Sequence, residues 1–228
     1  MNEADIHREW APPPGWAHVV ACCWEQRVST ERVQRVLPDG HADLLIHKCG
    51  LIEVVGLYDQ VALPVLAAGT RLGGVRLRSA AVASAFQTPA SSLRNRSVLA
   101  DTVLGSRRAR RLAEPRGLDA WIHSIEPSPR ASAAVKMLAT RPVDEVAAEL
   151  GVTGRQLRHI VLLEIGLAPK VYQQVVRLQR FVRAVDAGAP LAAAAATAGY
   201  ADQPHMTRDV RRFSGLTPAR LTQERGSA

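Results

Sequence analysis

The sequence predicts an α+β protein in which a β-rich N-terminal domain is followed by an all-α C-terminal domain. In the first half, apolar residues fall in short runs separated by turn signals such as Pro38-Asp39-Gly40, which is typical of strands. In the second half, apolar residues recur at helical spacing. Pro127 and Pro129 lie between the halves and discourage helix in the residues before them. We therefore place the domains at residues 1–126 and 127–228.

The composition is that of a soluble globular protein whose positive charge lies mainly in the C-terminal half. Of the 228 residues, 47% are hydrophobic and 22% are charged, which allows each domain a core. Residues 128–228 hold 14 Lys and Arg against 8 Asp and Glu, within a formal net charge of +8. Such a basic domain favours a polyanionic partner. Neither a membrane span nor a secretory signal is evident, so we expect a cytoplasmic protein with no membrane contact.

Five short apolar runs in the N-terminal domain predict strands. They cover residues 17–24, 42–46, 51–57, 61–66 and 70–78. In the last run, Val75 and Leu77 alternate with Arg76 and Arg78, which is the period of a half-buried strand. Residues 79–86 and 117–125 have helical spacing. We therefore expect a cupin-like domain or a small barrel, followed by helices.

An internal repeat divides the C-terminal domain into two similar units. Ala147-x3-Gly151 recurs as Ala195-x3-Gly199 after 48 residues. The sequence Gly-Leu-Ala-Pro at 166–169 recurs as Gly-Leu-Thr-Pro at 215–218 after 49 residues. One structural unit is therefore used twice.

The first unit reads as two helices joined by a short turn. Residues 143–150 predict a helix that ends at Gly151, where a left-handed cap favours glycine. Thr153 is suited to cap a second helix, which Leu157 anchors in the core and Gly166 ends. This order is that of a helix-turn-helix unit.

The second unit repeats the arrangement, and a long helix joins the two. A helix over 191–198 is followed by a turn at Gly199 and a helix from about Asp202 to Phe213, with Asp202 as its N-cap. Apolar residues at 171, 175, 178, 182 and 185 form one stripe on the joining helix. About 18 residues of helix span roughly 27 Å, which is of the order of the ~34 Å between successive turns of one DNA face.

The C-terminal residues resemble the AraC/XylS family of bacterial transcription regulators. The resemblance is carried by Gly199-Tyr200-Ala201-Asp202-Gln203-Pro204-His205-Met206-Thr207-Arg208 and by Phe213-Ser214-Gly215-Leu216-Thr217-Pro218. Val161, Met206 and Val210 stand where the family usually has an aromatic residue. The resemblance implies a sequence-specific DNA-binding regulator, either activator or repressor, with double-stranded promoter DNA and RNA polymerase as partners.

Two motifs of the N-terminal domain resemble the β-rich sensor domain of some family members. They are Leu37-Pro38-Asp39-Gly40-His41-Ala42-Asp43-Leu44 and Gly73-Gly74-Val75-Arg76-Leu77-Arg78, although Ser79-Ala80 stands where Pro-Gly often follows. The resemblance implies a sensing or dimerising role, with a small-molecule effector or a second copy of the chain as partner. We take Trp24, His41 and Asp43 as candidate effector contacts. All four tryptophans (Trp10, Trp16, Trp24 and Trp121) lie in this domain, and we expect most to pack in the core and one or two to line an effector cavity.

We expect the second helix of each helix-turn-helix unit to contact DNA. Arginine can pair with guanine, glutamine with adenine, and threonine with phosphate or a thymine methyl. The candidate DNA-binding residues are Gly154, Arg155, Arg158, His159, Asp202, Gln203, His205, Thr207 and Arg208. A second set of arginines is expected to contact phosphate or to be solvated: Arg177, Arg180, Arg183, Arg211 and Arg212.

Two alternatives stay open at this point. His41, Asp43, His47 and Cys49 alternate along one stretch and carry zinc-binding atoms, so a metal-dependent cupin-like enzyme with an accessory helical domain is one of them. A constitutive DNA-binding protein whose N-terminal domain only dimerises is the other. The three cysteines form neither a disulfide framework nor a C-x-x-C motif. Because no catalytic spacing is evident, we expect no catalytic residue, no metal and no cofactor.

Overall fold

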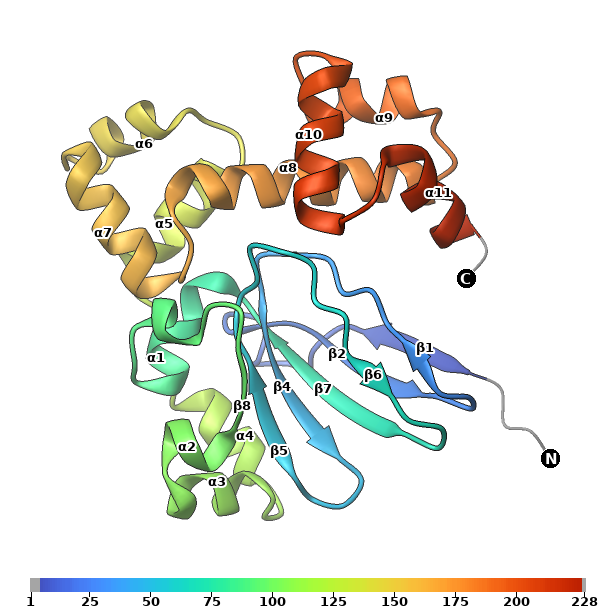
Figure 1. The fold of residues 1–228 in the computed structure, drawn as a ribbon. Helices are drawn as coiled ribbons and strands as arrows, with labels where there is room; N and C mark the ends of the chain where they lie inside the picture. Colours follow the sequence, from blue (N-terminus) through green and yellow to red (C-terminus); the bar gives the residue numbers. More distant parts are fainter. Residues whose placement is uncertain (1–4, 227–228) are drawn as a thin grey trace.

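A six-stranded antiparallel sheet organises the N-terminal half of this computed structural model, which describes residues 5–226 (Figure 1). The strand order is β1-β2-β7-β4-β5-β8. These strands are β1 (Ile6–Trp10), β2 (Val20–Arg27), β4 (Ala42–His47), β5 (Ile52–Val55), β7 (Arg71–Leu77) and β8 (Ser97–Leu99). A separate ribbon pairs β3 (Arg32–Val33) with β6 (Val65–Leu66).

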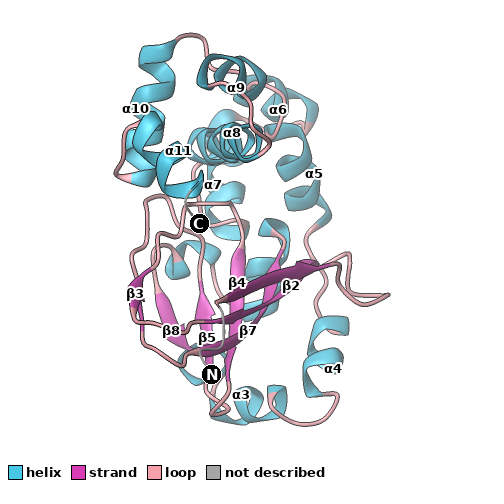
Figure 2. Ribbon diagram, turned by 90° about the vertical axis from the view of Figure 1, so that its right-hand side faces the viewer, coloured by secondary structure: helices cyan, strands magenta, loops and turns pink. Residues whose placement is uncertain are grey.

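The predicted strand runs correspond to β2, β4, β5, β6 and β7, whereas the sequence pattern did not reveal β1, β3 or β8. In β7, Val75 and Leu77 are buried and Arg76 faces the other side of the sheet, as the alternation predicted. Short helices follow along one side of the sheet (Figure 2). They are η1 (Ser79–Ala81), α1 (Val82–Phe86), η2 (Ala90–Leu93), α2 (Ala100–Leu104), α3 (Ser106–Leu112) and α4 (Gly117–His123).

The C-terminal half is helical and contains the two predicted helix-turn-helix units. Its helices are α5 (Pro129–Leu138), α6 (Val143–Glu149), α7 (Gly154–Glu164), α8 (Pro169–Asp186), α9 (Leu191–Ala198), α10 (Gln203–Ser214) and α11 (Pro218–Gly226). The pairs α6–α7 and α9–α10 form the units, and α8 joins them with 18 residues (Figure 1). No helix within residues 5–226 is both long enough and apolar enough to cross a membrane.

The two units are attached to the N-terminal half in different ways. Helix α7 of the first unit packs against η1, α1 and η2, and the buried residues form one continuous core across both halves. The approach is close, because a Cβ on Gly166 would lie 2.9 Å from the carbonyl oxygen of Ala90.

The second unit meets the N-terminal half through polar contacts. Arg35 donates to the Ser214 carbonyl oxygen at 2.6 Å and to Glu224 at 2.8 Å. Gln179 of α8 donates to the Pro38 carbonyl oxygen at 2.7 Å. A cavity of about 810 Å³ lies between β1, β3 and α11. The second unit is therefore held less tightly than the first.

Candidate DNA interface

The first helix-turn-helix unit is built by local signals that the sequence predicted. Gly151 ends α6 with a φ of +64°, a left-handed conformation that glycine adopts without strain. Thr153 caps α7 in a capping box, because its side chain accepts from the backbone N–H of Gln156 and the Gln156 side chain accepts from the N–H of Thr153. Leu157 is fully buried and anchors α7.

The outer side of α7 carries the predicted DNA-binding residues of the first unit. Arg155, Arg158 and His159 are all exposed, and Gly154 at the start of the helix has open space around it. A positive helix face that begins near a helix N-terminus suits a polyanion, since the free backbone N–H groups there add to the attraction. DNA contact by these four residues stays a prediction.

The second unit presents a smaller set of free side chains. Gln203 and Arg208 on α10 are exposed, and Thr207 is half-buried. Asp202 is the N-cap of α10, as predicted, and its carboxylate accepts from the backbone N–H of His205 at 2.6 Å. That side chain is therefore occupied in capping the helix rather than directed at a partner.

His205 does not stand on the exposed face of α10 as the sequence suggested. Its Nε2 lies 2.9 Å from Nη1 of Arg177 on α8, and its ring meets the edge of Tyr200 with 5.3 Å between ring centroids. Helical spacing places it one turn before Asp209, which faces α8. The residue therefore holds α10 against α8.

Asp209 belongs to the same contact between α10 and α8, and the sequence analysis missed it. It is 5% exposed and accepts from Nε2 of Gln174 at 3.1 Å. Its second carboxylate oxygen lies 3.6 Å from Nε2 of His205 and 3.9 Å from Nη1 of Arg177. The sequence signal that could have identified Asp209 is an acidic residue within the apolar stripe of Met206, Val210 and Phe213.

Replacing Asp209 by alanine is expected to lower the free energy of unfolding by about 1–3 kcal/mol, because the polar partners on α8 are left unpaired. Asp209→Asn keeps an acceptor for Gln174 and should lose less. Urea unfolding of both variants measures the difference. An alanine variant as stable as the parent would show that this carboxylate does not hold α10 in place.

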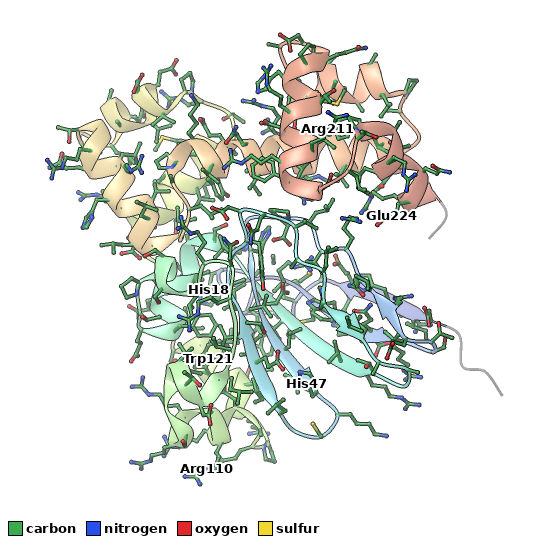
Figure 3. All side chains as sticks on the ribbon, in the orientation of Figure 1. His18, His47, Arg110, Trp121, Arg211 and Glu224 are labelled. Atoms are coloured by element: carbon green, nitrogen blue, oxygen red, sulfur yellow. The ribbon has the colours of Figure 1, made fainter. Side chains whose placement is uncertain are left out.

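The remaining arginines near the interface fall into two groups. Arg183 and Arg211 are exposed, and Arg211 lies on α10 (Figure 3). Arg180 instead donates to the carbonyl oxygen of Ala139 at the end of α5, at 2.7 Å. Arg212 donates to Gln174 at 3.1 Å. Arg180 is half-buried and one of its nitrogens is used inside the domain, so phosphate contact by its other N–H groups stays a prediction.

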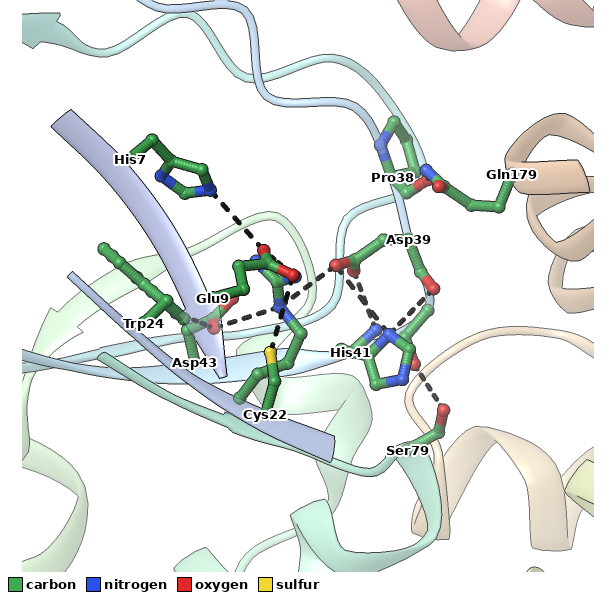
Figure 4. Close-up of polar contacts among 12 residues, drawn as sticks. His7, Glu9, Cys22, Trp24, Pro38, Asp39, His41, Asp43, Ser79 and Gln179 are labelled. Carbon is green, nitrogen blue, oxygen red and sulfur yellow. Dashed lines mark hydrogen bonds and ion pairs between the residues drawn. The ribbon is translucent and has the colours of Figure 1, made fainter. Parts of the chain in front are cut away.

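The candidate effector contacts lie in a cluster of charged side chains, the interior ion cluster, defined here as Glu9, Asp39, Asp43 and Arg76 (Figure 4). Arg76 lies 2.9 Å from Glu9, 3.3 Å from Asp43 and 3.4 Å from Asp39. Trp24 donates to Asp43 at 2.9 Å.

His41 contacts the interior ion cluster from its edge. Its backbone N–H donates to the Asp39 carboxylate at 2.9 Å. Burial raises the pKa of Asp43 although Arg76 acts against it. Burial alone would raise the pKa of Asp39 too, but His41 and Arg76 hold it below its usual value. Trp24, His41 and Asp43 are thus brought together, with the indole N–H of Trp24 bonded to Asp43 and Nδ1 of His41 at 3.0 Å from the Asp39 carbonyl oxygen.

The residues of the metal alternative are not brought together. His47 pairs with Glu53 at 3.2 Å, and Cys49 is exposed in the turn after β4. Among the residues that the structure describes, no three His, Cys, Asp or Glu side chains are grouped as metal ligands. Burial raises the pKa of Cys22 to about 11. Its thiol therefore stays protonated, whereas a metal ligand has to be a thiolate.

Comparison with known proteins finds two family models on this chain. A model described as a helix-turn-helix domain matches residues 130–224, and a model of a domain of unknown function, DUF6597, matches residues 8–99. No curated protein sequence matches the chain.

Similar solved structures include two of ToxT from Vibrio cholerae. The structure of ToxT from strain O395 shares 14% identity, with 90% of this chain and 97% of that chain covered and a TM-score of 0.47. A second crystal form shares 9% identity, covers 88% and 96% of the two chains, and has a TM-score of 0.41.

Proposed function

We propose, from the helix-turn-helix domain that matches residues 130–224, that the chain is a sequence-specific transcription regulator controlled through its N-terminal domain. One observation carries the proposal: the second helices of two similar units both present exposed polar side chains. These are Arg155 and Arg158 on α7, and Gln203 and Arg208 on α10. They match donors and acceptors that read base edges.

The linker helix sets the spacing of the two reading helices. With 18 residues, α8 spans about 27 Å. Successive major-groove segments on one face of DNA are ~34 Å apart. The length of α8 is of that order, which supports a placement of α7 and α10 in adjacent turns of the groove. Arg211, which is exposed on α10, is available to contact a phosphate beside them.

Control by the N-terminal domain follows from the unequal attachment of the two units. Helix α7 of the first unit packs directly against η1, α1 and η2 of that domain, whereas the second unit and α8 meet it through the polar contacts of Arg35 and Gln179. A ligand shifts such an arrangement only if it prefers one state of it. The units would then meet successive grooves in one state and not in the other.

The segment 37–41 is the proposed route from the sensor to the linker helix. It brings Asp39 to the interior ion cluster, where Trp24, His41 and Asp43 lie. The same segment contacts α8, through Gln179 at Pro38 and through Tyr172, whose ring would lie 3.2 Å from a Cβ on Gly40. An effector that moves this segment would therefore act on α8.

The proposal places the protein in the cytoplasm with promoter DNA as its partner. RNA polymerase and a second copy of the chain are further proposed partners, and activation and repression are both compatible with the geometry. The enzymatic alternative has no supporting observation, because His41, Asp43 and His47 have different partners. The constitutive alternative is separated from control by an effector in the experiment below.

The test is a selection of DNA fragments by the purified full chain, with and without a small-molecule extract of cells. We expect enrichment of one sequence with two elements about 10 base pairs apart, as for two groove-reading helices on one face. We also expect the extract to change the affinity for it. No enrichment at low salt would refute the proposed function. Enrichment that never responds to the extract would favour the constitutive protein.

A further inference from the structure

A groove on the sheet face opposite the interior ion cluster has no role in the proposed DNA interface. It has a volume of about 620 Å³. Its floor is formed by Gly73 and Val75 of β7 together with Cys23 of β2 and Ile46 of β4, which pair in register across the three strands. Residues Gly73 and Val75 face the same side, because alternate residues of a strand share a face.

The walls of the groove are aromatic and apolar. Trp10 at the end of β1 is 49% exposed, which is unusual for the largest apolar side chain. Trp16 is held against α4 by a hydrogen bond that its indole N–H donates to Asp119 at 2.8 Å. Pro13 and Leu118 complete this side. The groove thus has the size and the lining of a site for a small ligand.

Gly73 is a glycine that the fold itself does not require. A Cβ on its neighbour Gly74 would lie 2.1 Å from the ring of Trp24, so Gly74 is needed for packing. A Cβ on Gly73 would have only the carbonyl oxygen of Ile46 near it, at 4.0 Å, and the φ of Gly73 is not positive. Glycine weakens a strand, and an unexplained one often marks the close approach of a ligand.

One end of the groove gathers positive charge. Arg27 of β2 stands opposite Arg71 of β7, and the N–H of Lys48 donates to the Arg71 carbonyl oxygen at 3.4 Å. The three residues therefore form one row across neighbouring strands, and all three line the groove. Glu25 is the single carboxylate among the described residues that line the groove.

We propose that this groove binds a small organic anion with an apolar, ring-bearing body. The body lies over Gly73 between Trp10 and Trp16, and the anionic group lies beside Arg27 and Lys48. His47 marks this end of the sheet in Figure 3. As an effector site the groove rests on the proposed function, but its binding of an anion does not depend on DNA recognition.

The test uses 8-anilinonaphthalene-1-sulfonate, an apolar aromatic anion, titrated into the full chain and followed by its emission on excitation of tryptophan. N-phenyl-1-naphthylamine, which lacks the sulfonate, is the uncharged comparison. We expect one bound sulfonate per chain, held about tenfold or more tighter than the uncharged compound because of the cation row. Equal binding of the two compounds would overturn the role of the cations.

Variants of the groove locate the site. Gly73→Val places its Cβ in ordinary contact with the Ile46 carbonyl oxygen and its methyl groups in the groove, so it should weaken binding of the sulfonate by about tenfold or more, with an unchanged or higher melting temperature. The double variant Arg27→Gln and Lys48→Gln should weaken binding of the sulfonate and leave binding of the uncharged compound unchanged. Arg107→Gln with Arg110→Gln, exposed on α3 away from the groove, is the matched control and should change neither.

The outcomes separate this proposal from the proposed function. Sulfonate binding that survives in folded Gly73→Val, or that is lost equally in the α3 control, would refute the groove. If Gly73→Val does not fold, the Arg27 and Lys48 variant decides alone. A chain that binds the sulfonate as expected and selects no DNA sequence would keep the groove and refute the regulator.

Discussion

Arg155→Ala and Arg208→Ala are each expected to reduce the preference for the selected sequence over scrambled DNA by about tenfold or more, since an arginine paired with a base edge carries about 1–3 kcal/mol of discrimination. Both side chains are exposed on the second helix of a unit. Competition binding with the two DNAs measures the ratio. Arg155 is the stronger of the two predictions, because α7 packs against η1, α1 and η2 of the N-terminal half, whereas α10 meets that half through the contact of Arg35 with the Ser214 carbonyl oxygen.

The matched control is Arg183→Ala, on the linker helix. Arg183 is exposed and lies one helical turn after Gln179, to whose backbone carbonyl oxygen it donates at 3.2 Å, so its loss should leave the preference for the selected sequence unchanged. Arg180 is unsuited to this purpose because its bond to the Ala139 carbonyl oxygen joins α8 to the end of α5. An unchanged specificity ratio in both Arg155→Ala and Arg208→Ala would show that the reading face is assigned wrongly.

Replacing Arg76 by leucine is expected to lower the free energy of unfolding by about 1–3 kcal/mol at neutral pH, because it leaves half-buried carboxylates without their cation. The Arg76 side chain is 23% exposed, those of Asp43, Asp39 and Glu9 are 17%, 28% and 43% exposed, and solvent therefore screens part of the cluster. Urea unfolding of the variant and the parent gives the difference.

The loss should shrink as the pH falls. In the parent, the lowered pKa of Asp39 contributes stability above its unfolded pKa, which is lost on acidification. The raised pKa of Asp43 acts in the opposite sense, with stability present at low pH and lost as the pH rises through the folded pKa. Arg76 lowers the pKa of both carboxyls, so both bind protons at higher pH in the variant. Once protonated, neither needs the cation.

Arg8→Leu on β1 is the control for Arg76→Leu, since Arg8 is an exposed strand arginine outside the interior ion cluster. Its stability should stay within about 0.5 kcal/mol of the parent. An equal loss in both variants, or a loss for Arg76→Leu that grows on acidification, would contradict the electrostatic account.

The sequence alone predicted the architecture of the C-terminal half. Thr153 and Asp202 cap the helices they were expected to cap, Gly151 and Gly199 end the preceding helices in left-handed conformations, and α8 has the predicted apolar stripe. Helix caps, glycine stops and apolar periodicity act between residues at most a few positions apart. Such signals survive in a linear pattern because the interactions behind them are local.

The N-terminal half was predicted less completely. β1, β3 and β8 are short, and β1 and β8 are the edge strands of the sheet. Four of the five residues of β1 are exposed, so no apolar alternation marks it. Such strands form because a neighbouring strand offers hydrogen bonds to their backbone, which the side-chain pattern does not record.

Only the tertiary structure decided which polar side chains are free to bind and which hold the fold together. Partners inside the helical domain bind the side chains of Asp202, His205 and Arg180. Exposed side chains are instead found at Arg155, Arg158 and Arg208. Arg76 meets Glu9, Asp39 and Asp43 from distant parts of the chain. Sequence periodicity assigns a residue to a face of a helix or strand, but the partner on that face comes from another segment. The free energy of pairing two such groups depends on the distance and burial that packing sets, and so it appears only once the chain is folded.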